Sequence, residues 1–324
     1  MLLNIDAELV LNNAFSELRG HELEVCQDRD GSAQLEVLLH HCHVTHLTAL
    51  LEPLLQSANL STWFELMSNV FASHVIDAVF TQLQRGMTGP HVTEAEYLAG
   101  LDLVRQIVTC MTDSEHRAVL AEHWRQLLTS KYGSYTLRHT YSLVHVLLKQ
   151  ATKKGNRKAQ TTLTNHLSTL LTAITWSTDS KYLIDMCHHE ATAHVIEHVL
   201  EIAADTAVEV KLDNHVTQQG YLWLVDALLT TSESSEEEHV TAVLKRMKHA
   251  VWSHVMIMII KHVTALKSHQ KWNWSVLYQK YFRTRLNSLS AHPVANFVVQ
   301  SLIATSSTEP HWRMLFTEIE PQFR

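Results

Sequence analysis

Short stretches of apolar residues with helical spacing recur along the chain. In AHPVANFVVQSLI (291–303), apolar residues at 298, 299 and 302 fall on one side of a helix, because residues three and four apart share a helical face. Three other side chains then share a different face: Asn296, Phe297 and Gln300. The pattern predicts a short helix that turns two amides and one aromatic ring away from its core.

Six stretches share this pattern, which consists of a small or polar residue, usually a ring, two mostly apolar residues and a usually polar fifth residue. They lie within residues 28–39, 70–80, 131–144, 189–200, 249–260 and 292–303. A longer amphipathic segment precedes most of them, such as SEHRAVLAEHWRQLLTS at 114–130. A long helix followed by a short one, repeated and stacked, is the architecture of an α-solenoid.

The expected fold is therefore an all-α, curved right-handed α-solenoid that occupies residues 1–324 as a single domain of about six repeats. The spacing between repeats is irregular, which indicates insertions. The clearest candidates are at about 150–160, with KKGNRK, and about 230–238, with SESSEEE. Such charged runs usually form solvated connections.

Composition supports a helical protein. The apolar fraction of 46% excludes a wholly disordered chain, and 8 Gly with 5 Pro is few for an all-β protein. The formal net charge of −7, with 24 His counted as neutral, does not indicate a polyanion ligand. Nucleic-acid binding would depend on a local basic face, which the net charge does not report.

Cysteine usage and hydropathy restrict the environment. The four cysteines are far apart and form no CxxC pair, so neither a disulfide framework nor a zinc ribbon is expected, and a reducing compartment fits best. The longest apolar runs are shorter than the roughly 18 residues of a membrane span, and the amino terminus lacks a basic leader. We expect a soluble monomer without membrane contact.

The ring position suggests a chemistry. The residue after the small one is a flat ring in five of the six repeats, at His74, Tyr135, His194, His254 and Phe297, and is Ala33 in the first repeat. One ring per repeat on a concave face is what stacking on successive bases requires. Alternatively, Phe297 is a partly buried ring flanked by surface amides, and Tyr135 is a packed ring whose hydroxyl meets solvent beside the surface residue Arg138.

The residues that flank each ring could reach base edges. The pairs are Asn296 with Gln300, Ser32 with Glu36, Ser73 with Asp77, Ser134 with Arg138, and Ala193 with Glu197. An amide pair can donate to and accept from a uracil edge, while a carboxylate accepts from the N–H groups of guanine. Helical repeats that read one base each with two or three side chains are a known form of RNA recognition.

These residues resemble Pumilio (PUF) repeats, and LSAHPVANFVVQSLI, GSAQLEVLL and YGSYTLRHT more specifically resemble the nucleolar protein 9 family. The resemblance implies an RNA-binding solenoid that acts on small-subunit pre-rRNA in ribosome biogenesis, in the nucleolus of the nucleus, without catalysis or cofactor. Pre-ribosomal proteins are the implied further partners. Members of this family are generally longer, so the chain is expected to be part of a longer array.

Carried over residue by residue, the resemblance assigns Asn296 and Gln300 to uridine, with Phe297 as the stacking ring, and Ser32 with Glu36 to guanine. Two repeats depart from the pattern, because Ala193 has no polar group and Ile257 replaces the second edge-reading residue. One base per repeat along the whole chain is therefore not expected.

Other functions have weaker support. HHCHVTH (40–46) and MCHHE (186–190) offer metal-ligating side chains, but adjacent residues on one helix diverge, and structural zinc needs four convergent ligands. No GxSxG, P-loop or HExxH motif occurs, so an enzyme is not expected. The alternative is a protein-interaction scaffold like HEAT or armadillo proteins, which the acidic balance and Ile257 favour.

Overall fold

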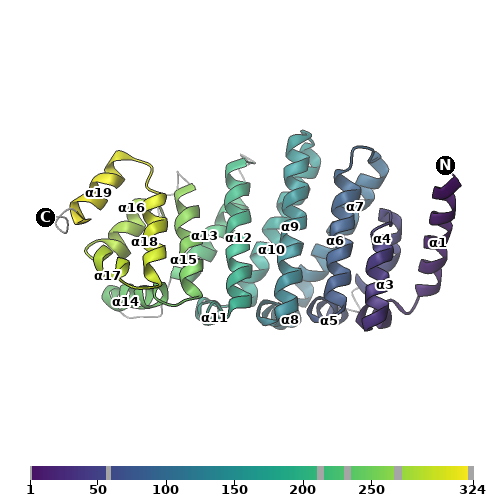
Figure 1. Ribbon diagram of the computed structural model, residues 1–324, viewed down its shortest axis with the longest axis horizontal. Helices are drawn as coiled ribbons and strands as arrows, with labels where there is room; N and C mark the ends of the chain where they lie inside the picture. Colours follow the sequence, from purple (N-terminus) through teal and green to yellow (C-terminus); the bar gives the residue numbers. More distant parts are fainter. Residues whose placement is uncertain (1, 56–59, 210–214, 230–234, 266–271, 320–324) are drawn as a thin grey trace. The chain divides into compact units, whose positions relative to one another are not determined.

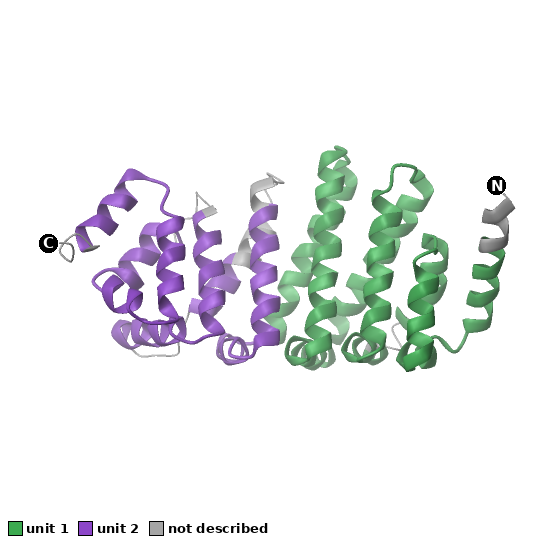
Figure 2. Ribbon diagram, viewed as in Figure 1, with its two compact units in different colours: residues 1–177 green, residues 178–324 purple. Residues whose placement is uncertain are grey.

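The computed structural model describes residues 2–55, 60–209, 215–229, 235–265 and 272–319. Within these ranges the regular elements are helices, and no strand occurs, which confirms the all-α fold class. The chain divides into two compact units, Met1–Ser177 and Thr178–Arg324 (Figure 2). Each unit is described below by itself, and a single solenoid over residues 1–324 stays a prediction.

Unit 1 contains ten α-helices and one short 3-10 helix within its described residues. They are α1 (Leu2–Leu18), α2 (Glu22–Gln27), α3 (Arg29–Leu39), α4 (Val44–Leu55), α5 (Leu60–Ser68), α6 (Ala72–Thr88), α7 (Glu94–Thr112), η2 (Ser114–His116), α8 (Arg117–Thr129), α9 (Lys131–Lys153) and α10 (Arg157–Ser177). They form repeats of three helices, because a short helix precedes each of α3, α6 and α9, and another helix follows it. Helix α6 packs against both α3 and α9, and α7 against both α4 and α10 (Figure 1).

Unit 2 continues the same order of elements. Its described helices are α11 (Ser180–Met186), α12 (Glu190–Glu209), α13 (His215–Leu229), α14 (Glu236–Met247), α15 (Trp252–Ala265), α16 (Trp274–Leu277), the π-helix η3 (Tyr278–Phe282), α17 (Leu286–Ser290), α18 (Ala295–Ala304) and α19 (Glu309–Ile319). Helix α15 packs against both α12 and α18. We call α3, α6, α9, α12, α15 and α18 the motif helices, because they carry the six sequence stretches.

The predicted order of helix lengths is wrong in most repeats. Helices α6 and α9 have 17 and 23 residues, whereas α5 and α8 before them have 9 and 13. The short motif marks only the first turns of a long helix. A third helix in each repeat was also not predicted.

The insertion expected at 150–160 is not a loop. Helix α9 continues to Lys153, α10 begins at Arg157, and only a tight turn lies between them. Gly155 provides the positive φ of 67° that this turn requires. Of the second expected insertion, residues 230–234 lie outside the described residues, and Ser235 and Glu238 form a capping box at the start of α14.

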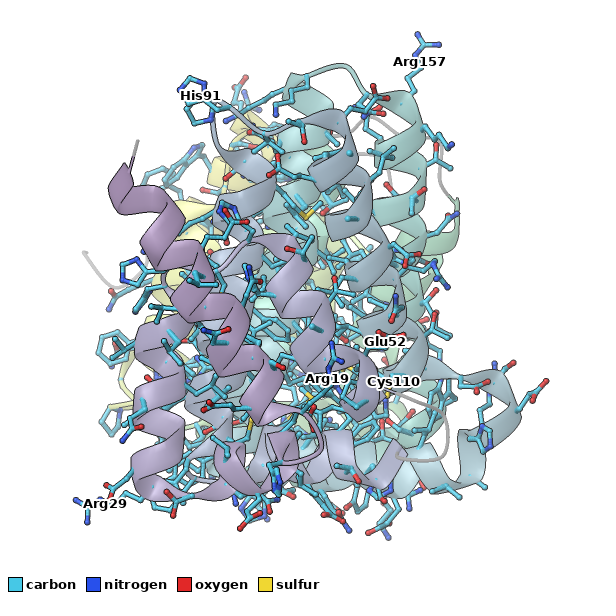
Figure 3. All side chains as sticks on the ribbon, turned by 90° about the vertical axis from the view of Figure 1, so that its right-hand side faces the viewer. Arg19, Arg29, Glu52, His91, Cys110 and Arg157 are labelled. Atoms are coloured by element: carbon cyan, nitrogen blue, oxygen red, sulfur yellow. The ribbon has the colours of Figure 1, made fainter. Side chains whose placement is uncertain are left out.

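Tryptophan side chains lie at the centre of the helix layers. Trp63, Trp124 and Trp252 are fully buried, and the indole N–H of Trp124 donates to the carbonyl of Met111, 2.8 Å away. Figure 3 shows Cys110 among the packed side chains, whereas Arg29 projects outward from the molecule. The interior between the layers is thus apolar, and charge is placed outside it.

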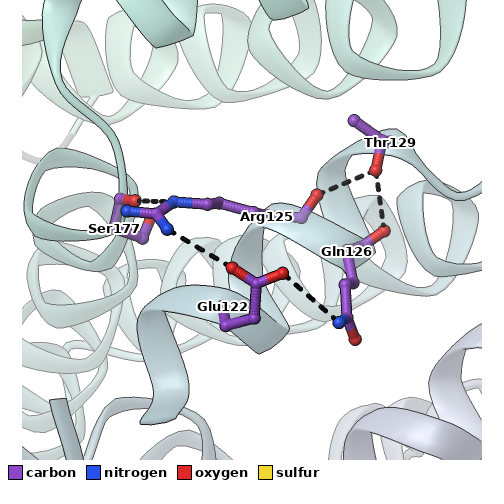
Figure 4. A network of polar contacts seen from close by, with 5 residues as sticks. All are labelled: Glu122, Arg125, Gln126, Thr129 and Ser177. Atoms are coloured by element: carbon purple, nitrogen blue, oxygen red, sulfur yellow. Dashed lines mark hydrogen bonds and ion pairs between the residues drawn. The ribbon is translucent and has the colours of Figure 1, made fainter. Parts of the chain in front are cut away.

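A polar network ties α8 to the end of α10 (Figure 4). The Arg125 guanidinium donates through Nε to the carbonyl of Ser177 (2.9 Å) and through Nη1 to the carboxylate of Glu122 (3.3 Å). Glu122 also accepts from the amide of Gln126 at 3.4 Å. This network satisfies a carbonyl at the end of α10 that has no partner within its own helix.

No described helix is long and apolar enough to cross a membrane.

Candidate nucleic-acid interface

The six sequence motifs occupy one equivalent place in the structure. In each motif helix the N–H of the small residue donates to the carbonyl four residues earlier, over 2.9–3.1 Å. The donors are Ser32, Ser73, Ser134, Ala193, Ser253 and Asn296. Each motif therefore forms the first turn of its helix, and the alignment read from the sequence is confirmed by backbone geometry.

Side chains at the start of these helices hold the first turn in place. The residue four positions before the small residue accepts hydrogen bonds from backbone N–H groups of the first turn in five repeats. These residues are Asp28, Asn69, Ser130, His249 and His292. Such caps satisfy N–H groups that have no partner within the helix. The sequence analysis missed this recurring position, although its period matches that of the rings.

The serines are turned into the repeat. Ser32, Ser73 and Ser134 are at most 3% exposed, and each hydroxyl donates to the backbone carbonyl three residues earlier. Ala193 is also buried. The expected orientation of the three hydroxyls toward a ligand is therefore not present in this structure. An edge contact from them remains a prediction, and it requires each hydroxyl to leave its carbonyl.

The rings point outward. His74, His194, His254 and Phe297 are exposed, and Tyr135 is partly exposed. The aromatic side chain of Phe297 is 56% exposed, whereas the two valines that follow it are buried. Ala33 is exposed in the first repeat, where no ring is available. The surface placement of the rings agrees with a stacking role, which remains a prediction.

The amide pair of α18 is already aligned. The Gln300 side-chain N–H donates to Asn296 Oδ1 over 3.0 Å, and the Asn296 amide donates to the carbonyls of His292 (3.0 Å) and Pro293 (2.9 Å). Gln300 keeps its own oxygen and a second N–H for another partner, because an amide has two donors and one acceptor. Asn296 acts here as the residue that orients Gln300.

The fifth positions of the other repeats are partly covered. Glu36 and Arg138 lie half-buried on α3 and α9, and Ile257 takes the same place on α15. In α12, His194 lies 3.5 Å from the carboxylates of both Glu190 and Glu197. The predicted ring and the predicted edge reader of this repeat are therefore in contact with each other.

Asp77 is enclosed by side chains of the next motif helix. The Tyr135 hydroxyl donates to its Oδ2 over 3.2 Å, and His139 Nδ1 forms an ion pair with its Oδ1. Burial raises the pKa of Asp77, but the hydrogen bond and charge of His139 and the hydrogen bond of Tyr135 outweigh it, so the pKa lies below the usual range. The sequence analysis did not single out His139, which has no equivalent in the other repeats except His198.

The two histidine-rich stretches do not form a metal centre. No group of three His, Cys, Asp or Glu residues is positioned to hold a metal ion among the described residues. Cys42 points inward, where its Sγ donates to the carbonyl of Leu38, and burial raises the pKa of its thiol to about 12. A protonated thiol is a poor metal ligand.

Comparison with known proteins identifies related chains. The sequence model of the NOP9-like PUF repeat domain matches residues 20–159 and 140–324. Pumilio homolog 23 from Arabidopsis thaliana is 20% identical over 338 residues, which cover 98% of this chain and 42% of that protein. The chain thus spans less than half the length of this relative.

Two solved structures share the fold. The structure of APUM23-GGAAUUGACGG has a TM-score of 0.72 at 19% identity and is matched over 98% of this chain and 55% of that one. The structure of APUM23-GGAGUUGACGG has a TM-score of 0.69 at 20% identity, over 97% and 55%. This likeness supports the helical-repeat architecture.

Proposed function

Because the chain belongs to the family of the NOP9-like PUF repeat domain, we propose that it binds RNA along its motif helices. One observation carries this proposal: the motif occupies the same first turn in all six helices, with the ring position outward at each. Packing of the core does not require exposed side chains to recur at equivalent positions. Stacking of successive bases does, because each base presents a flat face to one ring.

The chemistry of recognition differs between repeats. Phe297 and Tyr135 supply rings for stacking, and Gln300, held by Asn296, offers an acceptor and a donor to a uracil edge. Glu36 offers an acceptor to the N–H groups of guanine. One of the similar solved structures is that of APUM23-GGAAUUGACGG, and this nucleotide sequence contains both guanine and uracil. It supports a ligand of mixed guanine and uracil content.

Membership of this family also motivates a proposal for the biological target. We propose single-stranded or locally unpaired small-subunit pre-rRNA in the nucleolus, where the protein covers a site until a later step of ribosome biogenesis. The protein acts by occupying its RNA site, without a cofactor or catalysis. It does so as a monomer, alongside pre-ribosomal proteins. We expect few phosphate contacts, given the net charge of −7. The affinity should therefore fall only shallowly with salt.

Fluorescence anisotropy tests the proposal directly. Labelled GGAAUUGACGG, oligo-U and the DNA of matching sequence are titrated with the parent and with Asn296→Ala plus Gln300→Ala. We expect RNA-selective binding that weakens in this double variant. The matched control is Gln279→Ala plus Asn287→Ala, which removes two exposed amides of the same unit outside the motif helices.

Two results would contradict the proposal. Equal affinity of the double variant and the parent would remove the amide pair from the interface. No affinity for any RNA, together with a protein that co-purifies after nuclease treatment, would indicate a protein-interaction scaffold instead.

A further inference from the structure

Both oxygens of the Asp77 carboxylate on α6 lie against side chains of α9. The Tyr135 hydroxyl lies 3.2 Å from Oδ2, and the His139 imidazole pairs with Oδ1. The rings of Tyr135 and His139 are themselves 4.3 Å apart. The three side chains therefore form one cluster that bridges two successive motif helices.

The groups around this cluster reinforce it. The Arg138 guanidinium lies over the Tyr135 ring, 5.9 Å from its centre, and it carries positive charge on the α9 side. On the α6 side, the electrostatic interaction with His74 also lowers the pKa of Asp77. Helix α3, which also packs against α6, contributes Glu36 at its fifth position. Asp77 is thus the one acidic group of α6 and α9, and its neighbours on these two helices are donors or cations, whereas Glu36 on α3 is a like charge.

Occupied oxygens change what Asp77 can recognise. A carboxylate reads guanine by accepting two parallel N–H groups, one at each oxygen, and this needs both oxygens to face the base. Here a base edge would first have to displace a tyrosine hydroxyl and a histidine. The side chains of Asp77 and His139 are 26% and 36% exposed, so a base can approach the cluster, but Oδ1 of Asp77 is itself buried against His139.

We propose that Tyr135 and His139 prevent Asp77 from hydrogen-bonding a base edge, so that the repeat of α6 accepts any base. The inference rests on the proposed RNA binding and refines it. Glu36 occupies the same fifth position on α3 and reads guanine. Specificity in unit 1 is then set partly by contacts between neighbouring repeats and not only by the residues within each motif.

Removing the two groups that contact the Asp77 carboxylate tests this inference. The variant Tyr135→Phe plus His139→Ala keeps a ring for stacking and removes both partners of the carboxylate. Each position of GGAAUUGACGG is replaced in turn by the other three bases, and affinity is measured by anisotropy. We expect the double variant to gain about tenfold preference for guanine at one position where the parent discriminates less than twofold. Adding Asp77→Asn should abolish that gain.

The matched control is Glu36→Gln in the parent, which should weaken a guanine preference at a different position. Carbon-13 NMR of the Asp77 carboxyl gives a readout without RNA. Its pKa lies below the usual range in the parent and should rise in the double variant, because the interactions that lower it are removed while its burial remains.

The outcomes separate the two claims. If the parent already prefers guanine at a position where Asp77→Asn abolishes the preference, the inference is wrong and RNA binding stands. If NMR shows the carboxyl released in the double variant but no new preference arises, the inference is also wrong. If the parent binds no RNA, the proposed function fails, and the inference fails with it.

Discussion

Phe297→Ala separates RNA stacking from folding more cleanly than any other substitution at the ring positions. The ring is 56% exposed in the first turns of α18, next to Val298, which is fully buried. Full burial of a phenylalanine stabilises a protein by about 1.5–3 kcal/mol. Because less than half of this side chain is covered, its removal should lower the free energy of unfolding by about 1 kcal/mol.

The effect on binding should be larger than the effect on folding. Stacking of a base on an aromatic ring contributes about 1–3 kcal/mol, and each 1.4 kcal/mol is a tenfold change in affinity. The Phe297→Ala variant should therefore bind RNA about 5- to 150-fold more weakly. Phe297→Tyr should bind as the parent does, since it keeps the ring, whereas Phe297→Leu keeps apolar area and should lose most of the affinity.

Anisotropy at one fixed salt concentration measures the binding, and urea unfolding of the same samples measures stability. Trp312→Ala is the matched control, because this ring is 40% exposed on α19, outside the motif helices. It should leave the affinity unchanged. An affinity of Phe297→Ala within twofold of the parent would refute stacking at this position, and an equal loss in Trp312→Ala would show that the effect is not specific to the motif.

Three further predictions concern stability. Burial lowers the pKa of His262 from 6.5 to about 4, so the stability that its neutral form contributes is complete above pH 6.5 and is lost as the pH falls toward 4. Between pH 7 and 5 the parent should lose about 2 kcal/mol more than His262→Gln in urea unfolding, and parallel pH profiles would contradict this. Ser130→Ala removes the cap that accepts from Gly133 at the start of α9 and should cost about 1 kcal/mol; an unchanged urea midpoint would argue against that cap. Trp124→Ala should cost about 3–5 kcal/mol, because it empties a fully buried site and leaves the Met111 carbonyl without its 2.8 Å donor; thermal unfolding at the parent's temperature would exclude this.

Local sequence determined the features that repeat at helical spacing. The three stretches that begin at Ala72, Thr192 and Trp252 alternate buried and exposed positions in the same order. This order follows from apolar residues three and four apart, which must share a face wherever the helix packs. The outward rings and the six-fold recurrence of the motif could therefore be read without any structure.

Tertiary packing decided the features that join separate helices. Asp77 and Tyr135 are 58 residues apart, and nothing in either motif indicates that the acid of one repeat would bond the ring of the next. The inward turn of the Ser73 hydroxyl, the lengths of α6 and α9 and the third helix of each repeat were equally hidden. Sequence periodicity fixes which face of a helix is buried, but the partner of each side chain depends on how closely two helices pack, and that distance is set by the whole core.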